Sequence, residues 1–134
     1  MTVPLIVFPC LVASYFAVLW VVTGVWQKAL VTAVLAALVF SVTLLVTSIA
    51  VQNRPWRTFW IANLAHTTFF GGIELYALAL RGTNATRFGG ARLFDGHITS
   101  AGVASLLFDV GICVLSNIVG FCLARSLIKR LELS

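Results

Sequence analysis

Four long runs of apolar residues constrain this chain more than any other feature of its sequence. The first two, residues 3–26 and 29–51, contain no Asp, Glu, Lys or Arg. A helix needs about 20 apolar residues to cross the hydrocarbon core of a bilayer. Two further runs, residues 58–80 and 98–124, have a similar length but carry a few polar side chains. The pattern predicts an all-α, polytopic integral membrane protein, with four transmembrane helices in a compact antiparallel bundle that forms one domain over residues 1–134.

The composition is typical of a multi-pass membrane protein. Hydrophobic residues make up 60% of the chain and charged residues 10%, whereas about a quarter of the residues of a soluble domain are charged. The net charge of +5 comes from Lys and Arg residues around the apolar runs. No basic run is interleaved with aromatic residues in the way that reads nucleic acid. We therefore expect the chain to contact the lipid bilayer and no nucleic acid.

The connections between the runs are short, with one exception. Only Gln27 and Lys28 separate the first two runs, which predicts a tight antiparallel hairpin. The polar segment 52–57 leads into the third run. Residues 82–97 form a longer loop, with a glycosylation triplet at Asn84 that matters only in a secretory-pathway lumen. The first run lacks a preceding positive segment, so we expect a span and not a cleaved signal.

The third run is the least like a plain membrane span. Its polar side chains project from one side of a helix that turns about 100° per residue; they are Asn63, His66, Thr67 and Glu74. An ionisable side chain inside a membrane is costly, so this stripe should face protein or a wet cavity. Gly71 and Gly72, in mid-run, permit a bend or a close approach.

Small residues recur along the other three runs. Small side chains let membrane helices approach closely, so we interpret these residues as helix-packing positions. In the fourth run the small or polar positions share one face: Gly102, Ser105, Asp109, Cys113, Ser116 and Gly120. In the first two runs the positions are Ser14, Gly24 and Thr43. Because all three cysteines lie in apolar runs without a C-x-x-C pair, we expect neither a disulfide framework nor a thiol metal site.

The third and fourth runs are consecutive and therefore antiparallel, so a rise of about 1.5 Å per residue assigns each side chain a depth. The side chains that share a depth, and so can pair, are Asp109 with His66 or Thr67, Glu74 with Ser105, and Asn63 with Asn117. These contacts hold helices together in one interpretation. In the other, they form an ion or proton site, because an intramembrane carboxylate can carry a proton or pair with a cation.

Catalysis and cofactor binding have weaker support. A metal site needs three or more converging ligands, and the spacing of His66, Glu74 and Asp109 matches no ligand signature. A haem bound by both histidines would need His66 and His97, which a helical rise of about 1.5 Å per residue separates by roughly 20 Å. His66 can still ligate a haem together with a partner subunit. We predict no metal site and no catalytic residue, and the sequence requires no cofactor.

Three functions remain open. The small-residue stripes, the short loops and the lack of a soluble domain favour a non-catalytic accessory or structural subunit, or an assembly factor, of a larger membrane complex. Its partners would be other membrane subunits or copies of this chain. The alternative is a small oligomeric transporter or channel that uses Glu74 and Asp109. A further alternative is an intramembrane enzyme or haem-binding subunit that uses His66.

The positive charges predict the orientation in the membrane. With four spans, both termini lie on one side, which carries Arg54, Arg57, Arg125, Lys129 and Arg130. The other side carries Lys28, Arg81, Arg87 and Arg92. Because Lys and Arg are more frequent on the cytoplasmic side, we expect both termini to be cytoplasmic.

Overall fold

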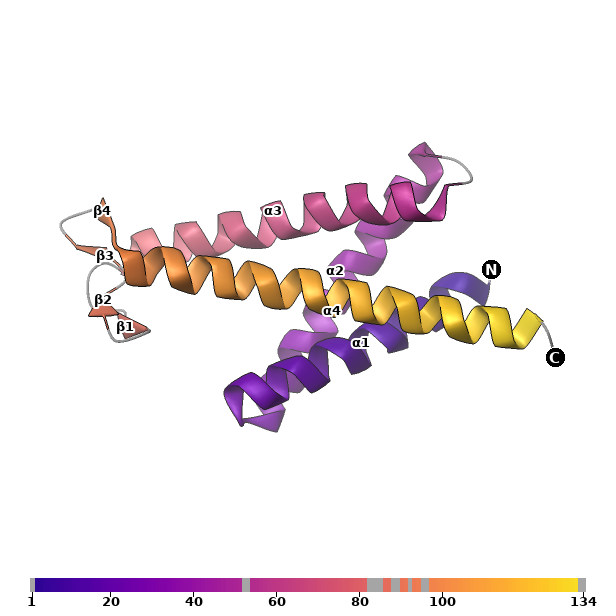
Figure 1. Cartoon of the computed structure of the whole chain (residues 1–134), viewed down its shortest axis with the longest axis horizontal. Helices are drawn as coiled ribbons and strands as arrows, with labels where there is room; N and C mark the ends of the chain where they lie inside the picture. Colours follow the sequence, from indigo (N-terminus) through magenta and orange to yellow (C-terminus); the bar gives the residue numbers. More distant parts are fainter. Residues whose placement is uncertain are drawn as a thin grey trace. The chain divides into compact units, whose positions relative to one another are not determined.

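The structure is a computed structural model, and it confirms the all-α prediction. It describes residues 2–51, 54–81, 86–87, 90–91, 93–94 and 97–132, and the side chains of residues 6–51, 54–76 and 97–132. Within these residues the chain forms four helices (Figure 1): α1 (Thr2–Thr23), α2 (Trp26–Ala50), α3 (Pro55–Arg81) and α4 (Ser100–Glu132).

The segment between α3 and α4 contains two antiparallel strand pairs of two residues each. The strands are β1 (Thr86–Arg87), β2 (Gly90–Ala91), β3 (Leu93–Phe94) and β4 (His97–Ile98). Thr86 pairs with Ala91 in the first, and Leu93 with Ile98 in the second. The Asn84 sequon begins outside the described residues.

Two compact units make up the chain. The first combines Met1–His66 with Ile112–Ser134, and the second is Thr67–Gly111. All four helices contribute to the first unit, which contains α1, α2, the beginning of α3 and the end of α4. The second unit contains the rest of α3 and α4, with the strands.

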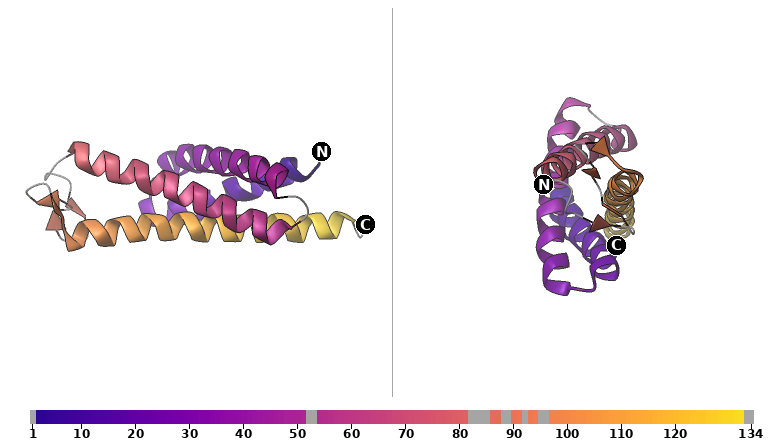
Figure 2. Two further views of the ribbon diagram at one scale, coloured as in Figure 1. Left: turned by 90° about the horizontal axis from the view of Figure 1, so that it is seen from above. Right: turned by 90° about the vertical axis from the view of Figure 1, so that its left-hand side faces the viewer.

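The first hairpin turns earlier in the chain than Gln27 and Lys28. α1 ends at Thr23, and Gly24 has a φ of +66°, a left-handed conformation that costs glycine nothing. The Gly24 amide donates to the Trp20 carbonyl at 2.9 Å, as expected at the end of a helix. Gln27 and Lys28 therefore belong to the first turn of α2, and α1 and α2 run side by side in opposite directions (Figure 2).

α3 and α4 extend beyond the apolar runs. α3 begins at Pro55, a residue favoured in the first helical turn because its missing N–H has no partner there anyway. α4 continues past residue 124 to Glu132, through a segment without Gly or Pro. Lys129 and Arg130 lie in its last turn, where positive charge stabilises the carboxyl end of a helix.

Three helices of the described chain are long and apolar enough to cross a membrane. The stretches are Ile6–Thr23, Trp26–Ala50 and Ser100–Glu132, and 18-residue windows within them have mean hydropathies of 2.2, 2.7 and 2.2. α3 carries the polar stripe and is not among these three. A multi-pass arrangement in contact with lipid is therefore plausible on helix length and composition.

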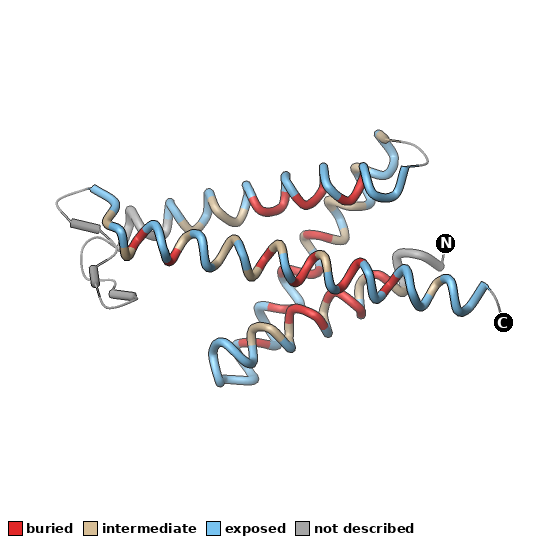
Figure 3. The backbone as a smooth tube through the Cα atoms, viewed as in Figure 1, coloured by how far each residue is buried: buried red, intermediate tan, exposed pale blue. Residues whose placement is uncertain are grey.

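Small side chains on α2 allow α1 to pack closely in the first unit. The buried residues of α2 follow a helical spacing: Ala29, Ala33, Ala36, Ala37 and Phe40. The buried residues of α1 lie between Val7 and Tyr15 and include Leu11 and Ser14, whereas Val21 is 87% exposed. Figure 3 marks the buried stretches of both helices in red.

Aromatic rings join the beginning of α3 to α2 and α4. Phe59 is fully buried and stacks on Phe121 of α4, with 4.5 Å between the ring centroids. It also meets Phe40 of α2 edge-on at 5.9 Å. Such aromatic pairs stabilise packing beyond the area that they bury, so this cluster fixes α3 where its polar stripe begins.

Candidate functional site

Five polar or polarisable side chains gather inside the first unit, and we call them the polar cluster. They are Tyr15 of α1, Asn63 and His66 of α3, and Cys113 and Asn117 of α4, and each is at most 8% exposed. Buried polar groups are costly unless they are hydrogen-bonded. The partners of each atom therefore decide whether the cluster can do chemistry or only hold helices together.

Asn117 is the centre of the polar cluster. Its carbonyl oxygen Oδ1 accepts a hydrogen bond from the Tyr15 hydroxyl at 2.5 Å. Its amide Nδ2 donates to Asn63 Oδ1 at 2.8 Å and lies 3.2 Å from His66 Nδ1. An amide has two N–H donors, and both are used here. One side chain of α4 thus connects α1 and α3.

His66 links the cluster to α2. Its Nε2 lies 3.2 Å from the backbone carbonyl of Ala36, and because a carbonyl oxygen only accepts, Nε2 carries the proton. Nδ1 is then the acceptor for the Asn117 amide, with Cys113 Sγ at 3.6 Å. The ring also meets Phe40 edge-on, at 5.1 Å between centroids. This assigns a neutral histidine whose two nitrogens both have protein partners.

Tyr15 is the member of the cluster that the sequence analysis missed. Its hydroxyl, besides bonding Asn117, lies 3.4 Å from both the carbonyl oxygen and the sulfur of Cys113. A tyrosine within an apolar run resembles any other core aromatic residue. Its neighbour Ser14 lies on the packing stripe of the first run, and a buried tyrosine usually needs a partner for its hydroxyl. Together these two facts could have identified Tyr15 as a hydrogen-bonding residue of the helix interface.

α1 and α4 are in direct backbone contact beside the cluster. The Ser14 hydroxyl donates to the Ser116 carbonyl at 2.8 Å. Gly120 faces Leu11: a Cβ on Gly120 would lie 3.0 Å from Leu11 Cα and 2.7 Å from its Cδ2. The Ser116 hydroxyl is buried and has no hydrogen-bond partner among the described residues.

The depth argument anticipated one pair of this site. Asn63 and Asn117, placed at one level from the helical rise, are hydrogen-bonded. In this unit His66 contacts Ala36 and Asn117. Its pairing with Asp109, a residue of the second unit, stays a prediction.

The carboxylates lie in the second unit. Glu74 of α3 and Asp109 of α4 are both half-buried there, whereas Thr67, Gly102 and Ser105 are buried. Both carboxylates make interactions within the chain. They remain candidates for an ion or proton site in a different unit from His66.

The remaining packing candidates are distributed over several environments. Gly71 would place a Cβ 3.8 Å from Val110, whereas one on Gly72 would meet nothing within 4 Å. Thr43 is half-buried and donates to the Val39 carbonyl of its own helix at 2.8 Å. Gly24 is exposed and forms the hairpin turn.

The polar cluster has little capacity left for a ligand. Both nitrogens of His66 are engaged, and so are the donors and the acceptor of Asn117. Within the part of the chain that the structure describes, no group of three or more His, Cys, Asp or Glu residues could hold a metal ion. The hydrogen bonds of the polar cluster connect α1, α2, α3 and α4 to one another.

Comparisons of the chain with protein-family models, with curated proteins and with solved structures found no match.

Proposed function

We propose that this protein is a non-catalytic structural subunit of a larger membrane complex. The observation that carries the proposal is the geometry of Asn117, whose hydrogen-bonding groups are all used to connect side chains of three helices. Polar side chains that serve transport or catalysis must keep an atom available for the ion or substrate. Those of the polar cluster are used for helix packing, which is the role a scaffold subunit requires.

The outward-facing surface supports association with partners. In an apolar 18-residue window of each of the three helices, only 28% of the residues are buried within the chain. Gly72 and Gly111 are exposed, with open space where a Cβ would be. Exposed glycines on membrane helices allow a neighbouring helix to approach closely, so these positions are suited to contact with a second chain.

Purification in a mild detergent tests the proposal. A tagged chain is expected to bring one or more membrane proteins with it in a fixed ratio. Gly111→Leu, which fills the open space beside α4, should lower the yield of partner, whereas the control Ala104→Leu on the same helix, also exposed, should not. A monodisperse single chain, free of partners in several detergents, would contradict the subunit proposal.

The transporter alternative makes a different prediction from the same sample. If Glu74 and Asp109 couple ions to transport, purified protein in liposomes should conduct or exchange ions, and Glu74→Gln with Asp109→Asn should abolish that flux. A structural subunit alone should give liposomes no ion flux above the empty-vesicle background. Wild-type flux that both substitutions eliminate would overturn our proposal in favour of the transporter.

We also propose that α3 is the fourth membrane crossing, with both termini cytoplasmic. Its length of 27 residues is sufficient, and its polar residues Asn63 and His66 are buried against other helices. This arrangement requires three crossings between Lys28 and Arg130, so the two residues must lie on opposite sides of the membrane.

Cysteine labelling tests this topology. Cys122, an exposed free cysteine, is first replaced by alanine, and Lys28→Cys or Arg130→Cys is introduced. A membrane-impermeant maleimide should label the first variant in intact cells and the second only after permeabilisation. Labelling of both from the same side would show that α3 does not cross.

A further inference from the structure

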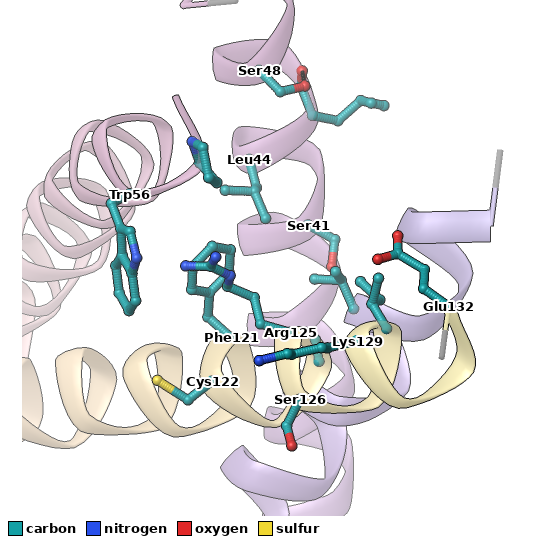
Figure 4. Close-up of a pocket in the computed structure, with 15 residues that line it drawn as sticks. Ser41, Leu44, Ser48, Trp56, Phe121, Cys122, Arg125, Ser126, Lys129 and Glu132 are labelled. Atoms are coloured by element: carbon teal, nitrogen blue, oxygen red, sulfur yellow. Dashed lines mark hydrogen bonds between the residues drawn. The ribbon is translucent and has the colours of Figure 1, made fainter. Parts of the chain in front are cut away.

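A groove of about 900 Å³ opens on the first unit between α2, the beginning of α3 and the end of α4 (Figure 4). Its volume lies within the range of about 300–1,000 Å³ that is usual for small-molecule sites. We call it the basic groove, because Arg125 and Lys129 line it. No polar group of the polar cluster contributes to it.

The walls of the basic groove are mainly apolar. They include Leu44 and Leu45 of α2, Phe121 and Ile128 of α4, and Val7 of α1. Leu45 is 52% exposed although it lines a concave surface. Such a surface in a membrane is suited to a hydrocarbon chain.

Two cations border these apolar walls. The Arg125 guanidinium lies 5.1 Å from the centre of the Trp56 ring, a cation–π contact that holds the side chain while leaving its N–H donors available. Lys129 follows one helical turn later on the same side of α4. In Figure 4 both extend from the side of α4 that faces Trp56 and Ser41. Of the described lining residues only Glu132 is acidic, which leaves a net charge of +1.

One polar atom inside the groove lacks a partner. The Ser41 hydroxyl is buried and forms no hydrogen bond with the described residues, although Ser41 lines the groove. Serine in a membrane helix commonly bonds to a carbonyl of its own helix.

The basic groove is formed at the ends of three helices. Ser48 is close to the end of α2, Pro55 is the first residue of α3, and Lys129 is in the last turn of α4. These helix ends carry a tryptophan and several arginines, which favour the membrane–water interface. Basic pockets between membrane helices on the cytoplasmic side bind anionic headgroups.

We propose that the basic groove binds an anionic phospholipid. Its phosphate contacts Arg125 and Lys129, and one acyl chain lies against Leu44, Phe121 and Ile128. Arginine suits this role because its planar guanidinium can hold two phosphate oxygens at once. A zwitterionic lipid presents the same hydrocarbon but adds a positive charge beside the two cations, so it should bind more weakly.

Native mass spectrometry of the detergent-purified protein tests the site with phosphatidylglycerol and phosphatidylcholine of identical chains. Wild type is expected to retain phosphatidylglycerol roughly tenfold better. The double variant Arg125→Gln/Lys129→Gln should abolish this preference, since two basic residues at roughly fivefold each are more than enough to account for it. Arg130→Gln is the matched control, because Arg130 lies in the same helical turn as Lys129 but does not line the groove.

One further variant and one competition experiment complete the test of the lipid site. Glu132→Gln should raise phosphatidylglycerol retention, an effect that a misfolded protein cannot give. Glycerol 3-phosphate in excess should not displace the lipid, because the apolar walls bind the acyl chain; displacement would show that the groove is a site for free phosphate compounds and overturn the lipid assignment. Equal retention of both lipids by wild type, or equal losses from Arg130→Gln and the double variant, would also overturn the proposal.

Discussion

Gly120→Val is expected to separate α1 from α4 and to destabilise the fold by about 2–4 kcal/mol, at the upper end of what overpacking costs. A Cβ at this position would lie 3.0 Å from Leu11 Cα. A flexible side chain can move aside, but a backbone atom moves only with its whole helix. Leu11 is fully buried, so its own side chain is already packed and has little room to move aside.

The measurement is unfolding in detergent micelles, followed by circular dichroism. Gly120→Ala should cost about 1–3 kcal/mol, less than valine, because its single methyl group needs a smaller displacement. Gly111→Ala on the same helix is the control: its Cβ meets nothing within 4 Å, and alanine favours a helix over glycine by about 0.5–1 kcal/mol. A valine variant as stable as wild type would mean that α1 and α4 are not in close contact at Gly120.

The sequence could predict positions along a helix better than contacts between helices. A fixed rise and turn per residue assign every side chain a depth and a face, which is why the pairing of Asn63 with Asn117 could be anticipated. The same arithmetic does not say which helix a face meets. His66 bonds the backbone carbonyl of Ala36, and every residue has such a carbonyl, so no residue type marks that partner.

Residues with two physical roles were the other source of error. Gly24 fits a packing stripe and also a turn, and its φ of +66° shows that it forms the turn. Tyr15 counts as apolar in a hydropathy pattern, yet its hydroxyl completes the polar cluster. The basic groove was equally hidden, because the end of α4 is far in the sequence from the end of α2 and the beginning of α3, and the helix boundaries differ from those of the apolar runs.

Asn117→Ala is expected to destabilise the protein by about 2–5 kcal/mol, because it removes one hydrogen bond from each of three buried groups. The Tyr15 hydroxyl, Asn63 Oδ1 and His66 Nδ1 each lose a hydrogen bond. A buried group left unsatisfied costs about 1–3 kcal/mol, and partial relaxation should keep the total below the full sum. Thr43→Val is the matched control in another span: the Thr43 hydroxyl bonds only within its own helix, so its loss should cost less than about 1 kcal/mol.

A double-mutant cycle with Tyr15→Phe separates this effect from a loss of packing. In the wild-type background the substitution removes the donor to Asn117 Oδ1, leaves that oxygen unsatisfied, and should cost about 1–2 kcal/mol. In the Asn117→Ala background the hydroxyl has lost that partner and keeps only its longer contacts with Cys113, so its removal should cost less. The coupling energy between the two sites should therefore reach about 1 kcal/mol or more. Strictly additive costs would mean that Asn117 is tolerated as an isolated polar residue, and the polar cluster would no longer explain how the four helices are held in register.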